Sequence, residues 1–220
     1  MSPLIIYPEG FAVTCPKEWF PVEVDTGSGV TGIKPWTLDY TDVIKKSPRI
    51  CLDLDGVVCV YDFPRMIKED FGIDIRSEDI YTYDIDDILG VTKEAVIAMF
   101  MKRVYDPAIC EPGALNTLNE WIAKGYEIFI YSNRINLIGT TALLLWLNDN
   151  DIPFTSLTRG LKNEYDLHID DRPPKLAATN SRYKMLYHRP WNDKCLDIKN
   201  QFRVVYNWKE IKERADMIFY

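Results

Sequence analysis

The stretch that decides the fold is Cys51-Leu52-Asp53-Leu54-Asp55-Gly56-Val57-Val58, in which an apolar run leads directly into two carboxylates and a glycine. In an open α/β sheet, ligands bind beyond the carboxyl ends of the strands, so reactive groups are expected at such a point. Asp53 and Asp55 are two residues apart, and side chains at that spacing on an extended strand point the same way. Two carboxylates at one site repel each other unless a cation or a proton lies between them. The stretch therefore predicts a strand that ends in a cation-dependent site, although a solvated acidic turn would show the same pattern.

Around this stretch, short apolar runs alternate with amphipathic segments, which is typical of an α/β domain on a parallel sheet. We expect strands at residues 49–54, 127–131, 154–158, 166–169, 183–187 and 203–206. We expect helices at residues 114–124, 137–148 and 208–217. The helix at 137–148 is apolar nearly all round, which predicts burial on several sides. Residues 63–107 carry helical patches, such as 93–103, and their place directly after the first strand indicates a cap over the sheet's carboxyl end.

Residues 1–48 differ in composition from residues 49–220. Pro3, Pro8, Pro16, Pro21 and Pro35 interrupt every run, and tryptophan and phenylalanine are scattered among them. Such a stretch cannot sustain a helix, and its aromatic residues favour an extension that lies against a partner surface. We therefore predict an N-terminal extension over residues 1–48, followed by a single α/β domain.

The composition is that of a soluble globular protein. The chain has 220 residues, of which 47% are hydrophobic and 27% charged, and a formal net charge of −7. An acidic balance argues against a general nucleic-acid binder, because affinity for the phosphate backbone comes from clustered Lys and Arg. No apolar run approaches the roughly 20 residues of a membrane span. The five cysteines form no C-x-x-C pair, so we interpret them as reduced thiols and expect a cytoplasmic protein. They are Cys15, Cys51, Cys59, Cys110 and Cys195.

Two further predicted strands end in polar groups. The stretch Asp166-Leu167-His168-Ile169-Asp170-Asp171 ends in a second pair of carboxylates. Acidic strand ends from one sheet can converge on a hard cation such as Mg²⁺, which takes oxygen ligands and retains waters for a substrate phosphate. The strand ending in Tyr131-Ser132-Asn133-Arg134 presents a hydroxyl, an amide and a guanidinium at the same edge, groups that suit an anionic oxygen. Taken alone, a serine such as Ser132 is more often a strand-end cap than a ligand.

The order of these motifs resembles that of the haloacid-dehalogenase-like (HAD) phosphohydrolases. Asp-Leu-Asp-Gly-Val-Val at 53–58, the strand ending in Ser132, a downstream lysine and Ile-Asp-Asp at 169–171 follow the family's four motifs. Within the family, the chain is most similar to the 5′(3′)-deoxyribonucleotidase branch, on the basis of residues 79–84, 111–114, 157–159 and 169–173. The resemblance implies a Rossmann-like parallel sheet flanked by helices, with a small helical cap inserted after the first strand.

The resemblance also implies residue roles. Asp53 would be the nucleophile and Asp55 the general acid and base. Asp53, the backbone carbonyl of Asp55 and the Asp170/Asp171 pair would hold Mg²⁺, with Asp171 favoured as the direct ligand of that pair. Ser132 and Asn133 would hold the phosphoryl oxygens, and Arg134 would add positive charge. Lys162 would neutralise charge and orient Asp53, although Lys175 and Arg159 lie near enough to leave this choice open.

We therefore expect a Mg²⁺-dependent phosphomonoesterase whose partner is a small phosphorylated metabolite, with a nucleoside monophosphate as first choice. A sugar phosphate or a polynucleotide 3′ end is the alternative substrate, and an idle HAD-like module that binds a partner protein is the alternative without catalysis. We expect neither a membrane nor an extended nucleic-acid surface as a partner, and a homodimer remains open. One departure from the branch is Ser132-Asn133-Arg134, where Thr-Ala-Arg is more usual; Ser supplies the same hydroxyl.

Overall fold

The structure is a computed structural model that describes residues 4–6, 12–14, 47–161, 164–193 and 201–219. The chain forms two compact units, residues 1–45 and 46–220. In the first unit, strands β1 (Leu4–Ile6) and β2 (Ala12–Thr14) pair antiparallel. The second unit carries all the predicted site residues. No helix among the described ranges combines the length and the apolarity that crossing a bilayer requires.

The core of the second unit is a six-stranded parallel sheet in the order β10-β9-β8-β3-β6-β7. Its strands are β3 (Arg49–Asp53), β6 (Glu127–Tyr131), β7 (Ser156–Thr158), β8 (Leu167–Asp170), β9 (Tyr183–Tyr187) and β10 (Arg203–Val205). Strand β3 is central, and its register pairs Asp53 with Tyr131 of β6 and Leu52 with Ile169 of β8. The predicted α/β class is thus confirmed, and the sheet aligns the ends of the motif-bearing strands.

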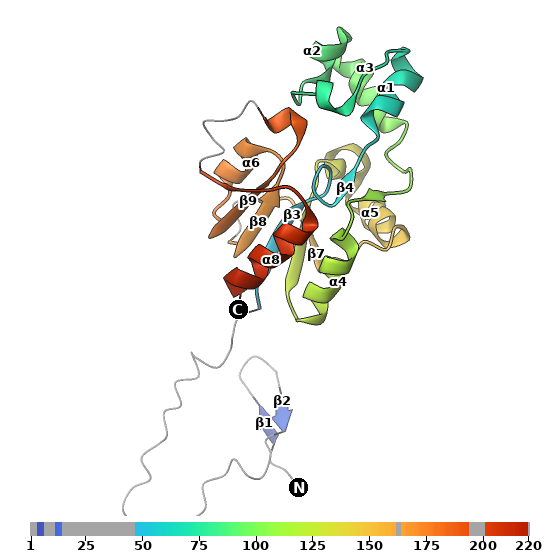
Figure 1. The fold of residues 1–220 in the computed structure, drawn as a ribbon. Helices are drawn as coiled ribbons and strands as arrows, with labels where there is room; N and C mark the ends of the chain where they lie inside the picture. The colour runs from blue at the N-terminus through green and yellow to red at the C-terminus, as the bar shows by residue number, and fades with distance from the viewer. Residues whose placement is uncertain (1–3, 7–11, 15–46, 162–163, 194–200, 220) are drawn as a thin grey trace, which may run out of the picture. The chain divides into compact units, whose positions relative to one another are not determined.

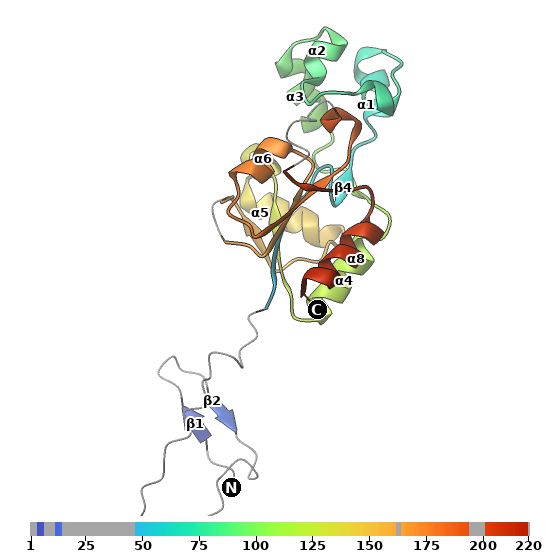
Figure 2. The ribbon, with the colours of Figure 1, turned by 60° about the vertical axis from the view of Figure 1, so that its left-hand side comes forward.

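Helices flank this sheet (Figures 1 and 2): α4 (Ala114–Ala123), α5 (Arg134–Asp149), α6 (Pro173–Ala178) and α8 (Trp208–Phe219). Helices α4 and α8 lie side by side, with the rings of Trp121 and Trp208 6.1 Å apart and both fully buried. The indole N–H of Trp208 also donates to the carbonyl of Val57, at 2.9 Å. Helix α8 is therefore attached to the turn that follows β3.

Helix α5 differs from its prediction in two ways. It begins at Arg134, and Gly139, with φ 80° and ψ 165°, interrupts its helical geometry. Leu143 and Leu147 are buried, but Leu144 is 38% and Leu145 60% exposed. The expectation of burial on several sides is wrong, because only one face of the helix meets the sheet and the sequence pattern alone does not show which apolar residues lack a partner.

A helical cap interrupts the chain between two short strands, β4 (Cys59–Val60) and β5 (Ile109–Cys110). It comprises α1 (Phe63–Phe71), a 3-10 turn at Ser77–Asp79, α2 (Ile85–Leu89) and α3 (Lys93–Met101). These helices lie together beyond one end of the sheet (Figure 1). The cap has its own apolar core, which consists of Met66, Ile67, Ile80, Ile85, Val96 and Met99. It is thus a packed subdomain positioned above the strand ends.

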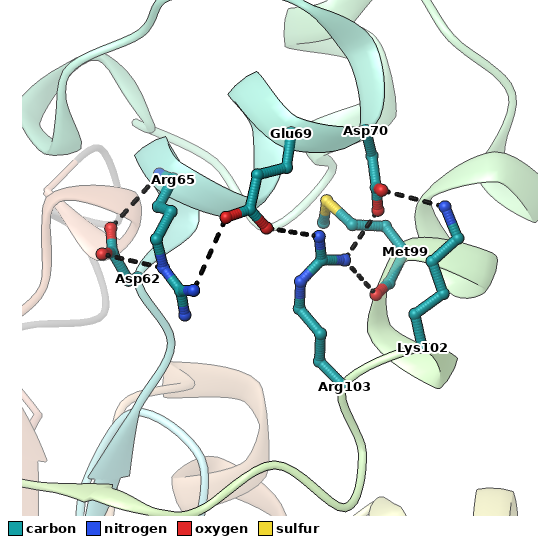
Figure 3. Close-up of polar contacts among 7 residues, drawn as sticks. All are labelled: Asp62, Arg65, Glu69, Asp70, Met99, Lys102 and Arg103. Carbon is teal, nitrogen blue, oxygen red and sulfur yellow. Dashed lines mark hydrogen bonds and ion pairs between the residues drawn. The ribbon is translucent and has the colours of Figure 1, made fainter.

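Charged side chains fasten α3 to α1 within the cap (Figure 3). The guanidinium of Arg103 lies 2.7 Å from Asp70 Oδ2 and 2.8 Å from Glu69 Oε2, and it also donates to the carbonyl of Met99. Lys102 Nζ lies 2.9 Å from the other oxygen of Asp70. Hydrogen bonds from Arg103 and Lys102 lower the pKa of Asp70 to about 2. Asp70 and Arg103 are 9% and 11% exposed, so this pair is shielded from solvent.

We predict that Asp70→Asn lowers the free energy of unfolding at pH 7 by about 1–2 kcal/mol, because it removes charge-assisted hydrogen bonds. The pKa of Asp70 is lower in the folded chain than in the unfolded one, so its contribution is present above about pH 4 and is lost as pH falls towards 2. Urea unfolding from pH 7 to pH 2 should show the unfolding free energies of wild type and Asp70→Asn converging. Lys102→Met, which removes the exposed partner, should cost less than about 1 kcal/mol. A deficit in Asp70→Asn that persists at pH 2 would contradict this assignment.

Candidate active site

Asp53 is the last residue of β3 and is only 4% exposed. The chain then turns sharply, and this turn is held by its own backbone. Cys59 donates its N–H to the carbonyl of Leu54 at 2.9 Å and accepts the N–H of Gly56 at 2.7 Å. The turn is thus closed by the first residue of β4, and it keeps Asp53 and Asp55 at the end of the sheet.

Gly56 allows the turn to approach β8 closely. Its φ is +97°, in the left-handed region that favours glycine. A Cβ built on Gly56 would lie 2.4 Å from Oδ2 of Asp171, which is closer than a Cβ atom comes to a non-bonded atom. The glycine of the motif therefore brings the Asp53 turn against the Asp171 carboxylate.

We predict that Gly56→Ala lowers the free energy of unfolding by about 1–3 kcal/mol, through backbone strain and displacement of Asp171. Displacement of Asp171 should also reduce any metal-dependent activity. Gly125→Ala is a matched control, because Gly125 has φ +83° but no atom within 4 Å of its Cβ position. Urea unfolding measures the loss of unfolding free energy in each variant, and the difference between the two losses is the contribution of the contact with Asp171. Equal losses in the two variants would show that the contact contributes nothing.

Three buried carboxylates meet at the ends of β3 and β8. Asp53, Asp170 and Asp171 each offer an oxygen, and these oxygens lie within 4.8 Å of one another. The N–H of Arg172 donates to Asp170 Oδ1 at 2.8 Å, and the indole N–H of Trp191 donates to Asp171 Oδ2 at 2.7 Å. Among the described residues, Asp170 Oδ2 and Asp171 Oδ1 accept no hydrogen bond. The cluster thus leaves two buried carboxylate oxygens that accept no hydrogen bond, although His168 Nε2 lies 3.5 Å from Asp170 Oδ2.

The electrostatics of this cluster favour a cation. Burial, followed by the nearby charge of Asp170, raises the pKa of Asp53 well above its ordinary value. Burial and Asp170 likewise raise the pKa of Asp171 to about 7. Like charges in a desolvated site are costly unless a counter-charge lies among them. An all-oxygen donor set with unpaired oxygens fits a hard divalent cation such as Mg²⁺.

Lys175, on α6, is the lysine that the structure places beside Asp53. Its Nζ lies 3.5 Å from Asp53 Oδ1 and 4.5 Å from the centre of the Tyr131 ring. Burial acts to lower the pKa of Lys175, but Asp53 and Asp170 outweigh it and raise that pKa. Lys162, the lysine favoured from sequence, lies outside the described residues, so its role stays a prediction. Helix α6 begins at Pro173, two residues after Asp171, and brings Lys175 back over the site.

Asp55 is held by Arg134 and Ser132. Arg134 Nη2 lies 2.8 Å from Asp55 Oδ1, and its Nε lies 3.1 Å from both carboxylate oxygens. The guanidinium is sandwiched between Trp146, at 4.1 Å from the ring centre, and Tyr61, at 5.1 Å. Ser132 Oγ donates to Asp55 Oδ2 at 3.4 Å. The structure therefore brings these residues together as predicted, but it pairs Arg134 with Asp55, and a phosphate-binding role for Arg134 stays a prediction.

A pocket of about 390 Å³ opens between this site and the cap. Asp53, Asp55, Asn133 and Lys175 line its polar end. Apolar and aromatic side chains line most of the rest, chiefly Tyr61, Phe63, Tyr83, Val96, Phe100 and Trp191, and the cap adds Thr82, Asp84, Asp86 and Lys93. Of the cap aromatics, Tyr81 and Tyr105 are not in the lining and are 44% and 64% exposed. A ligand with an anionic end and a flat apolar end would match this distribution.

Trp191 links the cap to the acidic cluster and was not singled out from the sequence. Its indole N–H binds Asp171, while its ring packs edge-on against Phe63, with centres 5.6 Å apart. The hydroxyl of Tyr83, also in the cap, donates to the carbonyl of Asp171. Trp191 follows β9 in a short 3-10 turn (Pro190–Asn192) that carries no polar motif, so no sequence signal marked it. Cap packing and the position of Asp171 are therefore coupled through Trp191 and Tyr83.

Comparison with known proteins agrees with this architecture. No protein-family model matches the sequence, and no curated protein matches it either. A predicted phosphatase from Clostridium acetobutylicum superposes with a TM-score of 0.53 at 11% identity, over 77% of this chain and 98% of that one. A haloacid dehalogenase-like hydrolase from Streptococcus pneumoniae superposes with a TM-score of 0.52 at 13% identity, over 79% and 99%. The fold is that of the HAD hydrolases. In that HAD fold, the acidic cluster described above lies at the carboxyl ends of the central strands.

Proposed function

We propose that this protein is a Mg²⁺-dependent phosphomonoesterase that acts on nucleoside monophosphates through an aspartyl-phosphate on Asp53. One observation carries the proposal. Asp53, Asp170 and Asp171 converge in a buried cluster, with Lys175 against Asp53, at the polar end of a pocket. This arrangement suits an attack on phosphorus by a carboxylate whose negative charge must be offset.

The side chains suggest a division of work. Asp53 would attack phosphorus, and Lys175 would hold its carboxylate in place. Asp55 would give a proton to the departing ester oxygen and then take one from the water that hydrolyses the aspartyl-phosphate. Arg134 and Ser132 fix the orientation of Asp55 for both transfers. Mg²⁺ held by Asp53, Asp170 and Asp171 would offset the repulsion between the nucleophile and the phosphate.

The shape of the pocket supports a nucleotide over a sugar phosphate. Beyond its polar end, the lining combines aromatic rings, Trp191 among them, with aliphatic side chains and with four polar side chains of the cap, Thr82, Asp84, Asp86 and Lys93. Flat aromatic bases stack on such rings, whereas a sugar phosphate has no flat aromatic face to stack on them. Phe63 and Phe100 come from two different cap helices and pack edge-to-face with centres 5.9 Å apart, so they form one apolar wall. A nucleobase would lie against that wall with its phosphate at Asp53.

Phosphate release from 5′- and 3′-nucleoside monophosphates, sugar phosphates and an aryl phosphate tests the proposal. We expect Mg²⁺-dependent release, with kcat/KM highest for nucleotides. Phe100→Ala should raise KM for nucleotides and leave the aryl phosphate less affected, because it shortens the apolar wall. Release from sugar phosphates alone would discard the nucleotide assignment while keeping the chemistry. No release from any compound would favour the idle partner-binding module.

A further inference from the structure

The two strands that connect the cap to the sheet carry opposed cysteines. Strand β4 leads into the cap and β5 leads out of it, and their antiparallel register pairs Cys59 with Cys110 and Val60 with Ile109. All three cap helices lie between these strands in the sequence. Cys59 therefore lies on the connection that enters the cap and Cys110 on the connection that leaves it.

The backbone geometry of this pair suits a disulfide. The neighbouring pair is hydrogen-bonded, since Glu111 donates its N–H to the carbonyl of Val58 at 2.9 Å. The N–H and the carbonyl of Cys59 are both hydrogen-bonded within the turn that follows Asp53. Cys59 and Cys110 therefore form a non-hydrogen-bonded pair. The Cα atoms of such a pair are about 4.5 Å apart, within the range that disulfides span. The two sulfur atoms already lie 3.7 Å apart as free thiols.

The two thiols differ in access. Cys59 is 1% exposed, whereas Cys110 is half-buried and open to solvent. The hydrogen bond between the two thiols lowers the pKa of Cys110 below its ordinary value. The thiolate is the attacking species in thiol–disulfide exchange. Cys110 is therefore positioned to attack a soluble disulfide. Cys59 is positioned to attack the mixed disulfide that forms on Cys110.

We propose that Cys59 and Cys110 form a redox-active dithiol that a low-molecular-weight disulfide, such as glutathione disulfide, converts to an intramolecular disulfide. The Cys110 thiolate attacks one glutathione sulfur, which breaks the S–S bond and releases one glutathione thiolate. Cys59 then loses its proton and attacks Sγ of Cys110, which releases the second. The two protons end on the released glutathiones, so one disulfide is reduced as one is formed.

Oxidation would act on the active-site turn directly. Bond formation draws Sγ of Cys59 towards Cys110, and Cys59 is the residue whose backbone closes the turn between Leu54 and Gly56. The same bond joins the entry strand and the exit strand of the cap. This functional consequence rests on the proposed phosphatase activity, whereas formation of the disulfide does not.

The first test is chemical. The full-length protein is equilibrated with reduced and oxidised glutathione, quenched with acid, alkylated and mapped by peptide mass spectrometry. We expect a peptide pair joined through Cys59 and Cys110, and a chain lighter by two hydrogens that retains no glutathione. Cys59→Ser should instead retain glutathione on Cys110, and Cys110→Ser should form no link at this site. The variant with both Cys15→Ser and Cys195→Ser should form the same link as the wild type. Stable glutathionylation of wild-type Cys110 without a link would overturn the proposal.

The second test is functional. We expect oxidised protein to release phosphate several-fold more slowly than reduced protein, with full recovery after dithiothreitol. Cys110→Ser should keep the basal activity and lose the response to oxidant. A protein that carries the Cys59–Cys110 disulfide and is fully active would overturn the proposed effect of oxidation on the active-site turn. If neither form released phosphate, the proposed function would fail, while the linked peptide would still support the dithiol.

Discussion

Asp53→Asn is expected to slow phosphate release by on the order of 10⁴-fold or more, because it removes the carboxylate that attacks phosphorus in the proposed mechanism. The same substitution should raise the melting temperature in the absence of metal. Asp53 is buried beside Asp170 and Asp171, which raises its pKa, and an amide removes that repulsion. Activity and stability should therefore change in opposite directions. Phosphate release and thermal unfolding on the same preparations measure both.

Asp149→Asn provides the matched control for Asp53→Asn, because Asp149 is an exposed carboxylate at the end of α5. It should leave both activity and melting temperature unchanged. An Asp53→Asn protein with native circular dichroism and wild-type turnover would exclude Asp53 as the nucleophile. A lowered melting temperature would show that Lys175 stabilises the ionised Asp53 more than its neighbours repel it.

Removal of Mg²⁺ is expected to abolish phosphate release and to destabilise the protein. A ligand at 100 times its dissociation constant stabilises the folded state by about 2.7 kcal/mol. For a domain of this size, that corresponds to a rise in melting temperature of roughly 5–10 °C. Thermal unfolding with EDTA and with excess Mg²⁺ checks this independently of any substrate.

Asp171→Asn tests whether the rise in melting temperature comes from Mg²⁺ bound at the acidic cluster. It should lose most of the Mg²⁺-dependent rise, because Asp171 supplies one of the three converging oxygens. Asp149→Asn should retain the full rise. An equal rise in Asp171→Asn and in wild type would place the metal elsewhere on the chain.

Much of the architecture followed from local sequence pattern. Alternating apolar runs predicted all six strands of the sheet to within two residues at either end. Parallel strands end at one edge, so the convergence of Asp53 with the Asp170/Asp171 pair followed from the strand assignments. These features depend on backbone hydrogen bonding and periodicity, which short stretches of sequence encode.

The contacts that the sequence left open depend on side-chain direction and on long-range packing. Nothing local distinguishes Lys175 from Lys162 as the partner of Asp53; the short turn into α6 decides where Lys175 points. Arg134 follows Ser132 at the start of α5, and the aromatic rings of Tyr61 and Trp146 turn it towards Asp55. Strands β4 and β5 have two residues each, too few to show alternation. Trp191 meets Asp171 from the turn after β9, 20 residues further along the chain, and no local pattern encodes such a contact.

The hydrogen bond from Trp208 to the carbonyl of Val57 has a consequence for biosynthesis. The indole belongs to α8, while Val57 lies in the turn that positions Asp53, 151 residues earlier in the chain. Domains fold as their residues emerge from the ribosome, beginning at the N-terminus. The turn is translated early, but its support arrives only with residues 208–219. A nascent chain should therefore be catalytically silent until this helix has left the exit tunnel, so premature termination before Trp208 yields no active fragment.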